Sequence, residues 1–375
     1  MYYPKQPFDL KELPPSIKLT DHPNLNSLFA ITTKAQKAIS ELKGSLSNIN
    51  NPEILLNSLY LQESISSSAV ENIHTTIESA LEDETKPDKE RSQNNKEVLK
   101  YRDALFAGQA SLEKYGLSSR TIKAIHKNLY VSKGVPGEFR QQQNSITNEL
   151  TDGSRHVIYT PPVHKDINRL LSNWETFADK NEEFIPLIKA AVCHYQFEAI
   201  HPFEDGNGRT GRILMVLQLV QDGLLDYPAL FISGYLSEFE NRYKNLLLEV
   251  TTKNKWWDFI EFMIVGFGYQ ANTTQIAINK LDVARLELIG RLMEDKKNII
   301  KKSNVEIVIN HIFENPTTHS KFMEEETGIH WQTCAKYLTH LSDIKILSQE
   351  KSGRYRFFSN NLALKALNKN LESKS

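Results

Sequence analysis

The chain has 375 residues, with 45 Lys and Arg against 46 Asp and Glu, so its formal net charge is −1. A domain typically takes about 100 to 200 residues, so this length predicts two or three compact units. The balanced charge argues against a protein that binds mainly to phosphate backbones, and 40% hydrophobic with 24% charged residues exclude a disordered or fibrous chain.

Signals for export or membrane anchoring are not recognisable in the sequence. Residues 1–15 lack the basic start and apolar core of a signal peptide, and no run reaches the roughly 18 apolar residues that a membrane helix needs. We therefore expect a cytoplasmic protein without a membrane partner. Cys193 and Cys334 lie far apart in apolar or amphipathic stretches without zinc-site spacing, and we expect both to be small core residues.

Helical periodicity dominates the first third of the chain. Apolar residues recur at three- and four-residue intervals in residues 28–42 and 54–61, which predicts amphipathic helices. Residues 82–96 are almost wholly polar and contain a proline, so we expect a solvated loop or a frayed helix end that buries nothing. Helical patterning resumes over residues 98–112 and 118–129.

The pattern changes between residues 133 and 162, where glycines and prolines flank a β-branched and aromatic run. That run contains Val157, Ile158 and Tyr159 and ends at two prolines, so we expect a short hairpin or flap. Six helical patterns follow, over residues 166–179, 186–200, 209–223, 238–251, 256–269 and 271–301.

The last block of the chain has a different order of elements. Three helical stretches precede two short strand-like runs, which is the order of a winged helix-turn-helix. We therefore predict a mainly α fold with a small β-hairpin and a C-terminal winged helix, in domains at residues 1–95, 96–302 and 303–375. The stretches and runs of the last block are residues 305–313, 320–326, 332–341, 346–349 and 354–358.

The most informative stretch runs from residue 201 to residue 212. One helix should end just before Pro202, and a second should start after Gly208. Between them, the backbone N–H groups of Gly206, Asn207 and Gly208 can form an anion-binding concavity at a helix N-terminus. This arrangement predicts a phosphate cradle.

Four charged or titratable side chains flank the predicted cradle. Arg209 and Arg212 lie three residues apart on one helix face and can grip phosphate oxygens. Asp205 offers the hard oxygen ligand that Mg²⁺ prefers, and His201 suits a general base near neutral pH. The set is that of phosphoryl or nucleotidyl transfer, although the Gly-Lys-Ser/Thr ending of a P-loop is absent.

Plainer interpretations exist for each of these features. Taken singly, the glycines would form an ordinary turn, Asp205 a helix cap and the arginines surface ion pairs; their convergence within twelve residues favours the phosphate site. A rival interpretation makes His194, Glu198 and His201 metal ligands, because their spacing puts them on one helical face. It does not match HExxH, no further ligand lies nearby, and His194 fits a core histidine better.

Residues 201–212 resemble the signature of Fic-domain proteins at every position: His, any residue, Phe, any residue, Asp or Glu, Gly, Asn, Gly, Arg, two free positions, Arg. Residues 135–140 resemble the Pro-Gly-x-aromatic-Arg turn of that family, residues 157–162 its substrate flap, and residues 125–129 its preceding helix. The resemblance covers residues 60–260 and implies a Fic-type helical core; a trailing winged helix also occurs in larger Fic proteins.

This resemblance implies a protein adenylyltransferase, which transfers AMP from ATP to a Ser, Thr or Tyr hydroxyl of a protein target or of itself. His201 would be the catalytic base and Asp205 would hold Mg²⁺. Val157, Ile158 and Tyr159 would pair by backbone with an extended target segment. The ATP-binding residues would be Gly206, Asn207, Gly208, Arg209, Arg212 and Tyr243, together with Thr210 and Gly211, which fill the free positions without a role of their own.

A second Fic-family pattern, Ser or Thr, three free positions, Glu, then Gly or Asn, matches Ser67 to Asn72. The resemblance implies an inhibitory helix in which Glu71 pairs with Arg212 and places negative charge where the γ-phosphate must bind. Ser67 would fix this helix by a local hydrogen bond. We therefore expect an enzyme that is isolated in a largely inhibited state.

The predicted winged helix keeps a second class of function open. Between residues 303 and 360, six Lys and Arg stand against seven Asp and Glu, a poor footprint for DNA, although Lys351, Arg354 and Arg356 gather in the predicted wing. One alternative is a DNA-binding regulator whose Fic core senses nucleotide, and another is a Fic enzyme that removes AMP or uses another nucleotide donor. The expected partners are ATP with Mg²⁺ and a protein target; self-modification, a second copy of the chain and DNA are further candidates.

Overall fold

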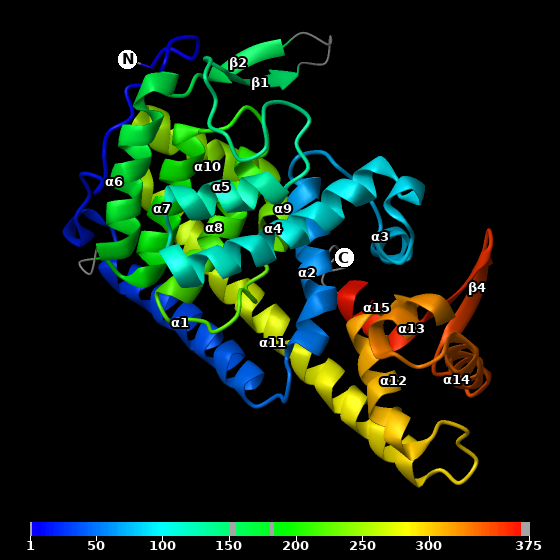
Figure 1. The fold of residues 1–375 in the computed structure, drawn as a ribbon. Coiled ribbons are helices and arrows are strands. Elements are labelled where there is room, and N and C mark those ends of the chain that lie inside the picture. The colour runs from blue at the N-terminus through cyan, green and yellow to red at the C-terminus, as the bar shows by residue number, and fades with distance from the viewer. Residues whose placement is uncertain (1, 150–154, 181–183, 369–375) are drawn as a thin grey trace. The chain divides into compact units, whose positions relative to one another are not determined.

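The structure is a computed structural model that describes residues 2–149, 155–180 and 184–368 (Figure 1). Each of the two compact units described below is mainly helical and contains a small antiparallel sheet, which confirms the predicted fold class. The domain boundaries placed from the sequence stay a prediction. The contacts define a first unit, Met1–Ser40 with Lys100–Gln270, and a second unit, Glu41–Leu99 with Ala271–Ser375.

Two buried helices, α7 (Pro186–Ile200) and α8 (Asn207–Gln221), are central to the first unit. Buried residues lie on all sides of α7, as expected for a helix with few polar residues. In α6 (Ile167–Lys180), Trp174 Nε1 donates to the carbonyl of Cys193 at 2.8 Å and ties α6 to α7. The unit also contains α5 (Ser119–Asn128), α9 (Ser233–Glu238), α10 (Glu240–Lys253) and parts of α1 (Leu25–Ser47), α4 (Gln93–Tyr115) and α11 (Trp256–Glu294).

The predicted hairpin is present in the first unit. Strands β1 (Ile146–Glu149) and β2 (Arg155–Tyr159) pair antiparallel, with a register shift between Ile146 and Thr147. Residues 150–154, which connect them, lie outside the described residues. Tyr159 fixes the hairpin to the core, because its buried hydroxyl donates to the carbonyl of Ala199 in α7 at 2.7 Å.

The second unit combines N-terminal helices with the C-terminal block. Strands β3, β5 and β4 form one antiparallel sheet in that order, and with α12, α13 and α14 they make the predicted winged helix. Helix α2 (Glu53–Ala69) packs against α12 and α15. The remaining elements are α3 (Ile77–Glu84), α12 (Lys302–Glu314), β3 (Thr317–Thr318), α13 (Ser320–Thr327), α14 (Trp331–Asp343), β4 (Ser348–Ser352), β5 (Tyr355–Ser359) and α15 (Asn361–Asn368).

The prediction that residues 82–96 bury nothing is wrong, although residues 87–90 are exposed between two helix ends. Helix α4 begins at Gln93, and the side chains of Asp83 and Asn95 are buried in this segment. They stabilise each other, because Asn95 Nδ2 donates to Asp83 Oδ2 at 2.7 Å and the backbone N–H of Ser92 donates to the same oxygen at 2.8 Å. Local hydrogen bonds thus allow a polar segment to be buried.

The two helices predicted over residues 256–269 and 271–301 are a single helix, α11, which ends at Glu294. Residue 270 is a buried glutamine, and it does not interrupt the helical hydrogen bonds as a proline would. Cys193 and Cys334 are buried free thiols, which confirms their prediction as core residues.

None of the helices in the described ranges is long and apolar enough to cross a membrane.

Candidate active site

His201 occupies a backbone position that the end of α7 creates. It follows the last helical residue with φ 50° and ψ 58°, the left-handed region that few residues other than glycine adopt. Pro202 has no N–H and cannot continue the helix. The imidazole is thereby carried on a sharp turn between α7 and α8.

Arg140 holds this turn in place. Its backbone N–H donates to the carbonyl of Pro202 at 2.9 Å, and its Nε donates to the carbonyl of His201 at 2.9 Å. The two terminal nitrogens of its buried guanidinium donate to the carbonyls of Gln142 at 3.1 Å and Pro162 at 2.6 Å. One side chain therefore connects the His201 turn to the base of the β1–β2 hairpin, a role that the sequence match assigned to no residue.

Asn207 closes the loop between the two helices with its side chain. Its Oδ1 accepts from the backbone N–H of Phe203 at 2.8 Å, and its Nδ2 donates to the carbonyl of Phe203 at 2.9 Å. The side chain is buried, so it is committed to the shape of the loop. The backbone N–H of Asn207 is the part of this residue that suits the predicted phosphate cradle.

Helix α8 begins at Asn207, earlier than the sequence predicted. Gly206 precedes it with φ 76°, and a Cβ at this position would come within 3.1 Å of Val131 Cγ1. The backbone N–H of Thr210 makes the first helical hydrogen bond, to the carbonyl of Gly206 at 3.0 Å. The N–H groups of residues 207–209 precede that bond, which makes the start of α8 suited to an anion.

Nearby hydrogen-bond donors stabilise the ionised carboxylate of Asp205. Its Oδ2 accepts from the N–H and the hydroxyl of Ser132 at 2.7 and 2.8 Å, and its Oδ1 accepts from the Gly206 N–H at 2.7 Å. Burial alone would raise the pKa of Asp205, but these hydrogen bonds and nearby Arg209 hold it below its ordinary value. Ser132 is one hydroxyl in a loop, and no sequence pattern singles it out.

The same carboxylate can be tested as a magnesium ligand. Three hydrogen bonds use three of its about four lone pairs, which leaves one on Oδ1, and the side chain is 28% exposed. Mg²⁺ commonly takes one or two carboxylates together with phosphate and water oxygens, so Asp205 fits a single-carboxylate site. Within residues 2–149, 155–180 and 184–368, no group of three or more His, Cys, Asp and Glu could hold a metal ion by itself.

The two arginines of the signature are both buried. Arg209 Nη1 donates to the carbonyl of Tyr130 at 2.8 Å, and its Nη2 lies 3.6 Å from Asp205 Oδ1. The side chain of Arg212 belongs to the largest fully buried side chains of the chain. Two buried positive charges in the first turns of α8 add to the positive potential of its N-terminus.

His194 and Tyr243 form a buried pair beside Arg212. His194 Nε2 lies 2.7 Å from the hydroxyl of Tyr243, and the two rings are stacked with centroids 5.9 Å apart. Burial and the charge of Arg212 lower the pKa of His194 to about 3, so this histidine is neutral in the fold. These contacts agree with a core histidine, and the contact of Tyr243 with adenine stays a prediction.

Thr210 and Gly211 serve the packing of α8. The hydroxyl of Thr210 donates to the carbonyl of Gly206 at 2.8 Å. A Cβ at Gly211 would lie 2.2 Å from Glu198 Oε1 and 3.0 Å from a ring carbon of Phe197, so only glycine allows α7 and α8 this close. Nucleotide contacts of either residue stay a prediction.

The outer edge of β2 already has neighbours from the N-terminal segment. Ile158 lies at the register shift, between Val157 and Tyr159, which pair with Thr147 and Ile146 of β1. The Tyr2 hydroxyl donates to the carbonyl of Ile158, and the Phe8 N–H donates to the carbonyl of Thr160 at 2.9 Å. The predicted target-pairing edge is therefore covered in part by the chain itself.

The Ser67–Asn72 segment lies in the second unit, where α2 ends at Ala69. Ser67 is buried, whereas Glu71 and Asn72 lie in the exposed turn that follows the helix. The N–H of Glu71 donates to the carbonyl of Ser68 at 3.0 Å, and Asn72 adopts a left-handed φ of 62°. The predicted inhibitory pattern thus spans a helix end and a turn.

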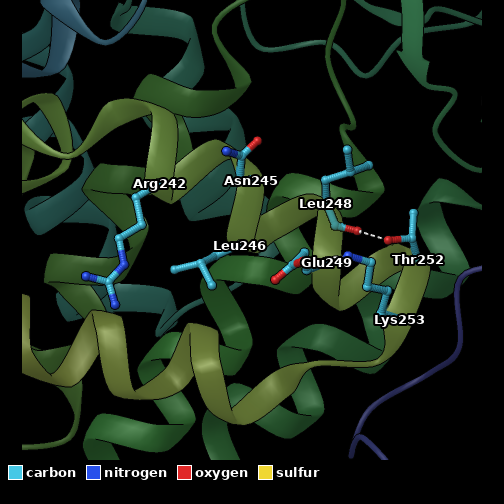
Figure 2. Close-up of a pocket in the computed structure, with 7 residues that line it drawn as sticks. All are labelled: Arg242, Asn245, Leu246, Leu248, Glu249, Thr252 and Lys253. Carbon is cyan, nitrogen blue, oxygen red and sulfur yellow. Dashed lines mark hydrogen bonds and ion pairs between the residues drawn. The ribbon is translucent and has the colours of Figure 1, made fainter.

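Helix α10 carries a separate surface hollow (Figure 2). The hollow measures about 620 Å³, and its described lining contains none of the signature residues. Tyr243 lies on the same helix but is buried against His194. The lining comes from Arg242, Asn245, Leu246, Leu248, Glu249, Thr252 and Lys253.

Three family models match successive parts of the chain. The Fic/DOC family N-terminal model matches residues 30–110, the Fic/DOC family model residues 116–219, and the protein adenylyltransferase SoFic-like C-terminal domain residues 292–362. The second match contains the whole signature from residue 201 to residue 212.

Curated relatives carry related names. The chain is 31% identical over 211 residues to a probable protein adenylyltransferase of Aquifex aeolicus, covering 54% of this chain and 62% of that protein. It is 28% identical over 239 residues to protein adenylyltransferase Fic of Drosophila yakuba, covering 62% and 44%. For Fic of Aedes aegypti the figures are 30% identity over 151 residues, 39% and 27%. The chain therefore spans less than two thirds of the length of each of these relatives.

Solved structures share the fold. A Fic family protein from Desulfovibrio desulfuricans G20 superposes with a TM-score of 0.55 at 18% identity, covering 88% of this chain and 95% of that one. Fic-1 from C. elegans superposes with a TM-score of 0.51 at 19% identity, covering 69% and 75%. The complete signature lies in the part of the chain that matches the Fic/DOC family model, so the chain contains a Fic/DOC family domain at residues 116–219.

Proposed function

We propose that this chain is a protein adenylyltransferase that transfers AMP from ATP to a hydroxyl group of a protein. The observation that carries the proposal is the geometry of one loop. The nine consecutive residues 201–209 carry the His201 imidazole, the Asp205 carboxylate and the N–H groups at the start of α8. The names of the Aquifex and Drosophila relatives support the same reaction.

The reaction needs a base, and His201 is the residue that fits this role. A ring nitrogen of neutral His201 would take the proton of a Ser, Thr or Tyr hydroxyl as its oxygen bonds to the α-phosphorus. The bond from that phosphorus to the bridging oxygen then breaks, and pyrophosphate leaves. The hydrogen bond from Arg140 to the His201 carbonyl supports this proposal, because it fixes the backbone of the base.

The phosphates would bind at the start of α8. The N–H groups of residues 207–209 and the buried arginines Arg209 and Arg212 are suited to the negative charge of a triphosphate. Asp205 would hold Mg²⁺, which would neutralise charge on the phosphates when bound. Val157, Ile158 and Tyr159 would pair by backbone with an extended target segment.

Inhibition by Glu71 is part of the proposal. The carboxylate would pair with Arg212 and occupy the place of the γ-phosphate, so that ATP binds in a nonproductive pose. The pairing would join residues of the two units, and its support is the match of Ser67–Asn72 to the family pattern.

A labelling experiment tests the transfer reaction. Glu71→Gly chain would be incubated with cell extract, Mg²⁺ and ATP labelled at the α- or the γ-phosphate. Relative to extract without the chain, we expect additional α-label but no additional γ-label, and a mass increase equal to AMP on the extract protein or on the chain itself. No additional label should appear with Glu71→Gly, His201→Ala. Additional γ-label would instead indicate phosphate transfer, and additional α-label in the double variant would reject His201 as the base.

The DNA-binding alternative has weaker support. Of the three basic wing residues, Arg354 contacts Glu90 of the same unit at 2.7 Å, which reduces the charge available for phosphate. A gel shift of the full chain at increasing salt would separate a DNA-binding regulator from an enzyme that leaves DNA unbound.

A further inference from the structure

His126 is a buried histidine of α5 that contacts the signature loop without belonging to it. Its Nε2 lies 2.9 Å from the carbonyl oxygen of Asp205, and its Nδ1 lies 2.9 Å from the backbone N–H of Gly137. A backbone N–H can only donate, so Nδ1 must be the acceptor and Nε2 must carry the hydrogen. The hydrogen-bond network therefore assigns one neutral tautomer to His126.

The ring of His126 also packs against the signature loop. It stacks on the ring of Phe203, with centroids 3.6 Å apart and an interplanar angle of 2°. At Gly206 a Cβ would lie 3.5 Å from His126 Nε2, so the loop backbone lies close to this edge of the imidazole.

The hydrogen bond to Asp205 sets the direction of a whole peptide group. The Asp205 carbonyl and the Gly206 N–H belong to the same trans peptide, in which the two groups point in opposite directions. With the carbonyl directed at His126, the N–H is directed at Asp205 Oδ1, 2.7 Å away. This peptide lies directly before Gly206, which has φ 76°, and therefore directly before the first N–H groups of α8.

We infer that His126 is a positioning residue for nucleotide phosphates, which acts through the Asp205 carbonyl on the anion-binding start of α8. The inference rests on the proposed function and adds a residue outside the signature to its binding site. Loss of the His126–Asp205 hydrogen bond lets the Asp205–Gly206 peptide rotate, and the N–H groups and the Asp205 carboxylate lose their common orientation.

Substitutions can separate the two hydrogen bonds of His126. Gln carries its amide nitrogen near the position of Nε2 and can still donate to the Asp205 carbonyl, whereas Asn carries its oxygen near Nδ1 and can accept only from Gly137. Phe keeps the stacking on Phe203 and loses both hydrogen bonds. The inference therefore ranks His126→Gln above His126→Asn and His126→Phe.

The experiment measures the affinity for Mg-ATP by calorimetry in a Glu71→Gly chain, together with the melting temperature. We expect the affinity to fall about tenfold or more in His126→Asn and His126→Phe and less than about threefold in His126→Gln. Thr121→Val is the matched control, because Thr121 is buried on the same helix and its hydroxyl donates to the carbonyl of Gly116 at 2.7 Å. It should lower the melting temperature without changing the affinity.

Each outcome decides for or against the inference. Equal losses in the Gln and Phe variants, unchanged affinity in all three, or a loss in Thr121→Val of the same size would overturn it. A Glu71→Gly chain that binds Mg-ATP with the expected ranking but transfers no AMP would reject the proposed function and keep His126 as a positioning residue. A chain that binds no nucleotide rejects both.

Discussion

The signature in the first unit and the Ser67–Asn72 segment in the second unit differ in the exposure of their charged side chains. Asp205, Asn207 and Arg209 are each fixed by hydrogen bonds from outside or across the loop, and two of them are buried. Glu71, in contrast, lies in an exposed turn after a helix whose last turns are buried. The difference matches the two proposed tasks, because phosphate binding needs groups that are oriented in advance, whereas an inhibitory carboxylate must be able to leave.

The contacts of α2 in the second unit offer a route for regulating the proposed inhibition. Asn57 Nδ2 donates to the carbonyl of Glu314 at 3.3 Å and Gln62 Nε2 to the carbonyl of Leu367 at 2.8 Å, so α2 is bonded to α12 and α15. The helix that precedes Glu71 is thus packed on the winged-helix domain. We expect changes in the winged helix to act on transfer through Glu71.

The largest effect that we expect comes from Arg140→Lys in a Glu71→Gly chain. Lysine keeps the charge, but its three donors share one nitrogen and cannot reach the three carbonyls that Nε, Nη1 and Nη2 of Arg140 contact, so the His201 turn loses its support. The AMP transfer rate at saturating ATP should fall about 100-fold, while the affinity for Mg-ATP stays unchanged. Rate measurements and calorimetry check this, with exposed Arg169→Lys as the control. Parallel losses of rate and affinity would contradict separate supports for base and phosphates.

Acid should weaken both units through buried neutral histidines. Burial lowers the pKa of His194 in the first unit to about 3 and that of His311 in the second to about 4. Both folded values lie below the ordinary 6.5, so their contribution to stability is present above pH 6.5 and is lost as the pH falls toward 4 and 3. For His194 the free energy of unfolding should drop by on the order of 2 kcal/mol between pH 6.5 and 5.

Urea unfolding of wild type and His194→Gln at pH 6.5 and pH 5 checks this expectation. The variant should lose less stability on acidification, and the remaining loss should include the contributions of His311, His126 and His319, whose pKa values burial also lowers. An equal loss in both chains would show that His194 does not contribute.

Gly206→Ala should have an intermediate effect on the site. Alanine is strained at φ 76°, and its Cβ would approach Val131 to 3.1 Å, so we expect the affinity for Mg-ATP to fall about tenfold. Gly223→Ala is the matched control, because Gly223 has φ 72° and no atom within 4 Å of its added Cβ. It should lose similar backbone stability and keep nucleotide affinity. Equal affinities in the two variants would reject the α8 start as the binding site.

The smallest effect concerns the wing. Arg354→Ala removes a contact with Glu90 that is exposed and screened by solvent, so it contributes little to stability. In wild type the AMP transfer rate should change by no more than about fivefold, and in Glu71→Gly it should not change. An equal change in both backgrounds would mean that the wing does not act through Glu71.

Sequence patterns predicted the fold and the signature because both depend on residues that are close in the sequence. The 3.6-residue periodicity of α7 and the Gly206–Gly208 turn are written in consecutive residues, and so is the order of the winged helix. The family resemblance includes Arg140 and His126, but the contacts that these residues make with distant segments are not visible in any such pattern. Arg140 and His126 act on backbone carbonyls more than 60 residues away, and Ser132 is 73 residues from Asp205. Asp83 and Asn95 are buried together because their side chains form a hydrogen bond. The polar sequence of this segment did not indicate that contact.

The most direct test of the central claim compares the initial rates of α-label incorporation by wild type, Glu71→Gln and Glu78→Gln at saturating Mg-ATP. Glu71→Gln keeps the shape of the side chain and removes the charge proposed to pair with Arg212, whereas Glu78 is an exposed glutamate of α3 in the same unit. We predict a rate at least about tenfold above wild type for Glu71→Gln alone, since a charged hydrogen bond to arginine is lost. Equal rates in all three chains would contradict inhibition of the first unit by the second.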